Sequence, residues 1–110
     1  MKLLIVGSRD ITEFDLSVYV TRDVDTIISG GARGIDSIAE KYADAHGLSK
    51  IILRPRYDLY GRVAPLKRNE EMVNICDAAL IIWNGKSRGT GYTLKYAQRV
   101  GKRIEIVTIG

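Results

Sequence analysis

Short apolar runs recur along the chain, and polar turns or segments with a helical period separate them. A short continuous apolar run is typical of a strand that is buried on both faces of a sheet. We therefore predict five strands, at residues 3–6, 26–28, 50–54, 78–83 and 104–109.

The clearest helical period follows Gly34. Apolar side chains recur on one face across residues 35–43, and His46 and Gly47 are residues that favour a helix end. The segment at residues 12–22 is ambiguous, because its acidic start favours a helix while a later Val-Tyr-Val run favours a strand. We predict a helix there.

A further helix begins at Pro65, and its apolar stripe extends to Cys76. The period places Asn69 on the inward face and Arg68 beside that face. Buried polar groups need hydrogen-bond partners, so this pair either ties down a loop or lines a polar cavity. The preceding loop, residues 56–64, is long enough to lie over a site.

The alternation of elements predicts the fold class. A last helix follows residues 87–91 and ends at Gly101, with an inward face formed by Thr90, Thr93, Leu94, Ala97 and Val100. Helices between consecutive strands require right-handed crossovers and cover both faces of the sheet. We predict an α/β fold: one Rossmann-like, doubly wound parallel sheet of about five strands in the order 3-2-1-4-5, forming a single domain over residues 1–110.

Three polar turns follow the first, second and fourth strands, at residues 7–9, 30–34 and 87–91. In a sheet of this order, the carboxyl ends of those strands meet at one crevice. Close packing alone would explain the glycines, but glycine turns and helix amino ends also suit a phosphate. We predict ligand binding by Gly7, Ser8, Arg9, Gly30, Gly31, Arg33, Gly34, Asp36, Arg68, Asn69, Ser87, Gly89, Thr90 and Gly91.

The composition of the chain limits the classes of function that we predict for it. The chain has 110 residues and a net charge of +4, which is compatible with a phosphate-bearing partner. One cysteine and one histidine leave no internal disulfide, metal-ligand cluster or Ser-His-Asp arrangement to predict, and we expect no cofactor. The opening apolar run is too short for a signal peptide or a membrane span, so we expect a cytoplasmic protein. A domain of this size is expected to form a homodimer.

Five motifs occur in a specific combination: Gly7-Ser8-Arg9, Gly30 to Asp36, Tyr60-Gly61 followed by Ala64, Arg68-Asn69 with Met72, and Ser87 to Thr90. Together they resemble the YspA-like, YpsA-related branch of the SLOG superfamily. The run at 30–36 is also similar to the Rossmann-like domain of DNA-processing protein A. The resemblance implies a Rossmann-like domain that binds nucleotides, nucleotide-derived ligands or nucleic acid, as a sensor or accessory protein.

The related Lonely Guy phosphoribohydrolases, of the lysine decarboxylase-like group, provide a test for enzyme activity. They use a glutamate where this chain has Thr93, and a threonine cannot act as a carboxylate base. The nearby carboxylates are chiefly Asp36 and Glu71. The place of Asp36 in the first helical turn favours a capping role over catalysis, and Glu71 falls on the outward face of its helix. We therefore assign no catalytic residue and disfavour hydrolysis of an N-glycosidic bond.

Two hypotheses follow. The first is a binding module in which a nucleotide phosphate lies on the glycine turns, with Trp83 or Tyr60 near the base. The second is single-stranded DNA binding, which needs a basic track interleaved with aromatic side chains. The residues for such a track are Arg54, Arg56, Arg62, Lys67 and Arg68, with Tyr57 and Tyr60 between them.

Overall fold

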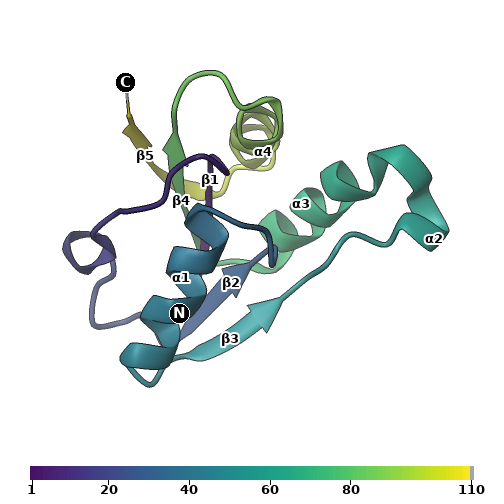
Figure 1. The fold of residues 1–110 in the computed structure, drawn as a ribbon. Helices are drawn as coiled ribbons and strands as arrows, with labels where there is room; N and C mark the ends of the chain where they lie inside the picture. The colour runs from purple at the N-terminus through teal and green to yellow at the C-terminus, as the bar shows by residue number, and fades with distance from the viewer. Residues whose placement is uncertain (110) are drawn as a thin grey trace.

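The computed structural model describes residues 1–109 and shows an α/β fold built on one parallel sheet (Figure 1). The strand order is β3-β2-β1-β4-β5, as predicted, and every neighbouring pair is parallel. The strands are β1 (Lys2–Gly7), β2 (Thr26–Ser29), β3 (Ser49–Ile52), β4 (Ala78–Trp83) and β5 (Arg103–Thr108).

Helices lie on both faces of the sheet. The α-helices are α1 (Ile35–Ala45), α2 (Tyr57–Tyr60), α3 (Ala64–Ile75) and α4 (Arg88–Arg99), and the 3-10 turns are η1 (Leu16–Val18) and η2 (Gly61–Val63). Helix α1 packs on one face, and α3 and α4 pack on the other. Among the helices of residues 1–109, none is long and apolar enough to cross a membrane.

Strand β1 lies at the centre of the sheet, between β2 and β4. Its side chains alternate between two cores: Leu3 and Ile5 pack with α1, whereas Leu4 and Val6 pack with α3 and α4. Both faces are therefore buried, which explains why the run is continuously apolar and does not alternate with polar residues.

The prediction of a helix at residues 12–22 is wrong. The structure has only the turn η1 there, with the Asp15 carboxylate accepting from the Ser17 N–H. Leu16 is buried against the α1 face of the sheet, while Val18 is 74% exposed, so the segment has one apolar anchor and no helical stripe.

Two smaller differences concern element ends. Val100, predicted to face inward, is 42% exposed, because α4 ends at Arg99 and the chain turns at Gly101 with φ of 76°. The predicted loop at residues 56–64 contains α2 and η2. Figure 1 shows these two elements at the tip of an arm that extends from β3 before α3 returns to the sheet.

We expect Leu4→Ala to lower the free energy of unfolding by about 2–5 kcal/mol, because Leu4 is fully buried at the centre of the sheet. Urea denaturation measures the change. Val18→Ala is the control and should change stability by less than about 0.5 kcal/mol, since the side chain is exposed. Equal costs for the two variants would contradict the assignment of the core.

Candidate functional site

A cleft opens where the strand order reverses, between the carboxyl ends of β1 and β4. It has a volume of about 80 Å³, and the turn before α1 and the helices α3 and α4 form its walls. Ligands of doubly wound sheets bind at such a switch point. The structure brings eight of the predicted residues together in its lining: Gly7, Arg9, Asp36, Arg68, Asn69, Ser87, Gly89 and Thr90.

A wider and more open hollow of about 530 Å³ adjoins the cleft. The two share Arg9, Ala32 and Arg68 in their linings, so they form one continuous surface. Three more predicted residues line the hollow, namely Gly30, Gly31 and Arg33.

The remaining three predicted residues line neither space. The Ser8 side chain is buried, and its hydroxyl accepts from the Asn84 N–H at 3.2 Å. Gly34 has φ of 75°, and a Cβ there would lie 2.6 Å from the carbonyl oxygen of Arg9, so close packing explains this glycine. Gly91 packs against Trp83, outside the cleft.

The amino end of α4 forms one wall of the cleft. Ser87 caps the helix: its hydroxyl accepts from the Thr90 N–H at 3.4 Å and lies 3.0 Å from the Thr90 hydroxyl. The backbone N–H groups of Arg88 and Gly89 have no acceptor within residues 1–109. These donors and the positive end of the helix dipole favour an anion here.

Two backbone donors of the turn after β2 are already paired. The Gly31 N–H donates to the Ser29 hydroxyl at 3.3 Å, and the Ala32 N–H donates to Asp36 Oδ2 at 3.1 Å. Asp36 therefore caps an amide of the turn, whereas α1 itself has no side-chain cap at its N-cap residue Gly34. The Asp36 carboxylate places a negative charge beside this turn, which makes the α4 wall the better anion site of the two.

Arg68 ties the turns after β2 and β3 together. Its Nη1 donates to the carbonyl oxygens of Gly30 at 2.6 Å and Leu53 at 3.3 Å, and its Nε donates to Asn69 Oδ1 at 2.8 Å. Of the two possibilities that the sequence leaves open, the structure shows both, because Arg68 and Asn69 tie down loops and line the cleft.

Gly30 lies between two buried charges. A Cβ at Gly30 would lie 2.6 Å from Arg68 Nη1 and 2.9 Å from Asp36 Oδ2, so a larger residue would displace one of these side chains. Burial raises the pKa of Asp36, and the Ala32 N–H and the charge of Arg68 oppose that shift. Burial likewise lowers the pKa of Arg68, opposed by the charge of Asp36. A carboxyl with a raised pKa inside a cleft is typical of functional sites.

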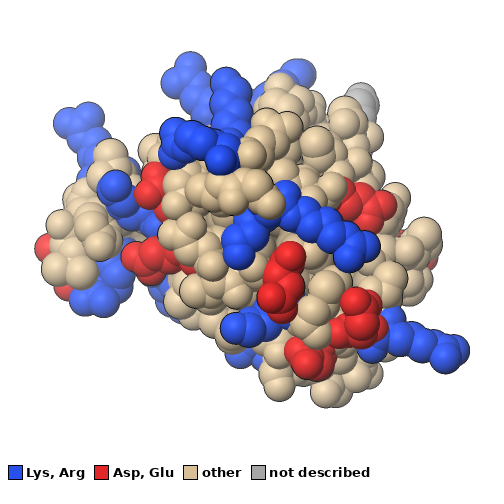
Figure 2. All heavy atoms as spheres, turned by 180° about the vertical axis from the view of Figure 1, so that it is seen from behind, with Lys and Arg blue, Asp and Glu red and all other residues tan. Residues whose placement is uncertain are grey.

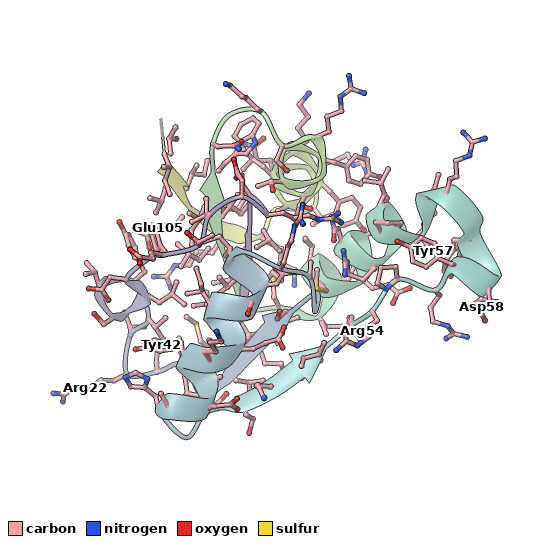
Figure 3. The ribbon with its side chains drawn as sticks, in the orientation of Figure 1. Arg22, Tyr42, Arg54, Tyr57, Asp58 and Glu105 are labelled. Atoms are coloured by element: carbon pink, nitrogen blue, oxygen red, sulfur yellow. The ribbon has the colours of Figure 1, made fainter. Side chains whose placement is uncertain are left out.

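Two residues outside the predicted ligand set also lie at this surface, and they were predicted only as part of the DNA track. Arg54 and Tyr57 line the hollow, and Arg54 Nη1 also donates to the Gly31 carbonyl oxygen at 3.2 Å. Figure 3 shows both residues on the arm that follows β3. The position of Arg54 could have been predicted, because this residue lies at the carboxyl end of the third strand. That end is at the same edge of the sheet as the glycine turns. Trp83 and Tyr60, expected near a base, line neither the cleft nor the hollow.

Thr93 lies in the wall of the cleft. Its hydroxyl donates to the Gly89 carbonyl oxygen at 2.9 Å within α4. Within residues 1–109, no group of three or more His, Cys, Asp or Glu side chains is placed to hold a metal ion.

We expect Arg68→Met to lower the free energy of unfolding by about 1–3 kcal/mol, since the buried Gly30 carbonyl and the Asn69 side chain lose their donor. Chemical denaturation provides the measurement. Arg62→Met removes an exposed arginine of the arm as the control. If the two variants unfold alike, the contacts of Arg68 do not hold the loops.

Asp36 should make stability depend on pH. A carboxyl whose pKa is raised above 3.8 by folding stabilises the fold fully only below that ordinary value, and the contribution is lost as pH rises through the folded pKa. The melting temperature of Asp36→Asn minus that of the parent chain should therefore increase between about pH 4 and pH 7. Glu71→Gln, at an exposed position of α3, is the control. A pH-independent difference for Asp36→Asn would show that burial does not perturb the carboxyl.

Comparison with known proteins identifies a related phage protein. No protein-family model matches the chain, and no solved structure matches it. The chain is 31% identical over 90 residues to the Gene 61 protein of Mycobacterium phage D29, and this match covers 76% of the chain and 70% of the phage protein. The chain therefore belongs to the same family as the Gene 61 protein of this phage.

Proposed function

We propose that the chain binds the phosphate of a nucleotide or of a nucleotide-derived ligand, as a SLOG-type Rossmann-like domain with a sensor or accessory role. The observation that carries the proposal is the amino end of α4, where Gly89, whose amide is unpaired, lines the cleft together with Arg9. A helix amino end beside an arginine is suited to a phosphate group.

The sizes of the two spaces suggest how such a ligand lies. The cleft of about 80 Å³ is too small for a whole nucleotide, because pockets for small molecules usually measure about 300–1,000 Å³. The adjoining hollow of about 530 Å³ is large enough for the rest of the molecule. Tyr57 is 60% exposed at its edge and offers a ring face to a base.

The charges within the cleft orient the ligand. Ionised Asp36 repels a phosphate, and Arg68 is already bonded to three oxygens. The phosphate therefore lies toward Gly89 and Arg9. The Asp36 carboxyl and the Asn69 amide are then suited to hydroxyl groups of a sugar, which they can bind by hydrogen bonds.

The geometry gives less support to the DNA track along the arm. Arg56 pairs with Asp58 at 3.3 Å and Lys67 pairs with Glu70 at 3.8 Å. Arg68 is buried, so it does not belong to an exposed track. The structure also adds no support for hydrolysis of an N-glycosidic bond, because the Thr93 hydroxyl donates a hydrogen bond within α4.

A thermal-shift screen of nucleoside mono-, di- and triphosphates, with inorganic phosphate alongside, tests the proposal. A bound nucleotide at about 100 times its Kd adds about 2.7 kcal/mol of stability and raises the melting temperature. Arg9→Ala should then weaken binding of that nucleotide about tenfold, as expected for the loss of one charge-assisted hydrogen bond. Calorimetric titration measures the Kd.

Arg22→Ala is the matched control. Figure 3 shows Arg22 at the opposite end of the molecule from Arg54 and Tyr57, and its removal changes the net charge by the same amount. A screen without any shift, or equal affinities for the Arg9 and Arg22 variants, would refute the proposal. Release of free base during incubation would instead favour the hydrolase alternative.

A further inference from the structure

A second hollow lies on the outer side of α4, beside the end of β4 and the loop that follows it. It measures about 350 Å³, and it shares only Ser87 with the lining of the cleft. Two aromatic side chains, Trp83 and Tyr92, form its apolar part, and Lys86, Arg88 and Lys95 surround them. Trp83 also packs against the core, but the ligand site proposed above does not use this combination of rings and cations.

Both rings are held in place. Trp83 Nε1 donates to the Ser87 carbonyl oxygen at 3.0 Å, and the Tyr92 hydroxyl donates to a Glu70 carboxylate oxygen. A Cβ at Gly91 would lie 3.0 Å from Trp83 Cζ2, so the glycine leaves room beside the indole that any other residue would occupy. Rigid aromatic surfaces bind a flat partner at a low cost in conformational entropy.

The cations extend beyond the hollow. Arg88, Lys95 and Arg99 are spaced at i, i+7 and i+11 along α4, which places them on one exposed stripe about 16 Å long. No Asp or Glu occurs in the chain between Asp77 and Glu105, so α4 itself has no acid. From α3, the Glu70 carboxylate accepts a hydrogen bond from the Tyr92 hydroxyl. Figure 2 shows Lys and Arg side chains gathered at the end of the molecule that α4 forms in Figure 1, with the acidic side chains lower on that face.

We propose that the α4 stripe, Lys86, Arg88, Lys95 and Arg99 around the Trp83–Tyr92 hollow, binds single-stranded nucleic acid. A base stacks in the hollow and the phosphates follow the cations. Stacking platforms within a positive groove are the general means of binding single strands without sequence preference. A stripe of about 16 Å is longer than one phosphate needs, which favours a strand over a mononucleotide. A duplex fits poorly, because its bases are stacked on one another and hide their faces.

The chain contains its own probe for this contact, since Trp83 is its one tryptophan. Oligodeoxythymidylate of about 15 nucleotides should quench the indole fluorescence as a base stacks against it. Four phosphate contacts predict a slope of about −2.8 for log K against log salt concentration, at roughly −0.7 for each contact. Duplex DNA of the same length should cause little quenching.

Two variants separate stacking from charge. Arg88→Gln/Lys95→Gln should weaken binding about tenfold or more and reduce the salt slope by about 1.4. Arg22→Gln/Lys41→Gln removes the same charge from exposed positions elsewhere and should leave the affinity nearly unchanged. Gly91→Leu fills the space beside Trp83 while keeping every cation, so it should abolish quenching; a melting curve verifies its fold.

The proposal fails if fluorescence anisotropy of a labelled oligonucleotide shows saturation without indole quenching. It also fails if the two double variants lose affinity equally, which would indicate a general attraction of the +4 chain for polyanions. Equal binding of duplex and single strand would exclude the stacked base. None of these outcomes depends on whether the cleft binds a nucleotide.

Discussion

The burial of β1 on both faces is the constraint on which the other features depend. A central strand with two apolar faces requires helices above and below it, and the crossovers to β2 and β4 leave on opposite sides. The strand order therefore reverses beside β1, and the chain segments that follow β1 and β4 diverge there. The cleft is the space that this divergence leaves, so the packing of the core determines where a ligand can bind.

Buried charge shapes the cleft once it exists. Arg68 reaches from α3 to the turn after β2, and that turn approaches closely because Gly30 has no side chain. Burying a guanidinium and a carboxyl is costly unless hydrogen bonds compensate, and here backbone groups supply them. Hydrogen bonds to Ser29 and Asp36 engage the Gly31 and Ala32 amides, and Asp36 adds a carboxylate that the turn before α4 lacks, which makes the two glycine-rich turns chemically unequal.

Helix α4 connects the two proposed binding surfaces. Its amino end, capped by Ser87, faces the cleft, while its outer side has the cations and rings of the α4 stripe. An amphipathic helix buries one face, including Leu94 and Ala97, and leaves the other available. The two surfaces differ in physical character: the cleft offers directed backbone donors to one group, whereas the stripe offers dispersed charge and flat apolar area.

The amino-acid sequence by itself determined the strands, their order and most of the residues around the cleft, because continuous apolar runs and glycine turns are local signals. It could not determine residues 12–22, where one anchor, Leu16, replaces a helical stripe. Only the tertiary structure decided which donors remain available. The acceptors of Arg68 lie 38 and 15 residues away in the chain, and Asp36 competes with an anion for the Ala32 amide. Such contacts depend on distances in space, which no periodicity along the chain records.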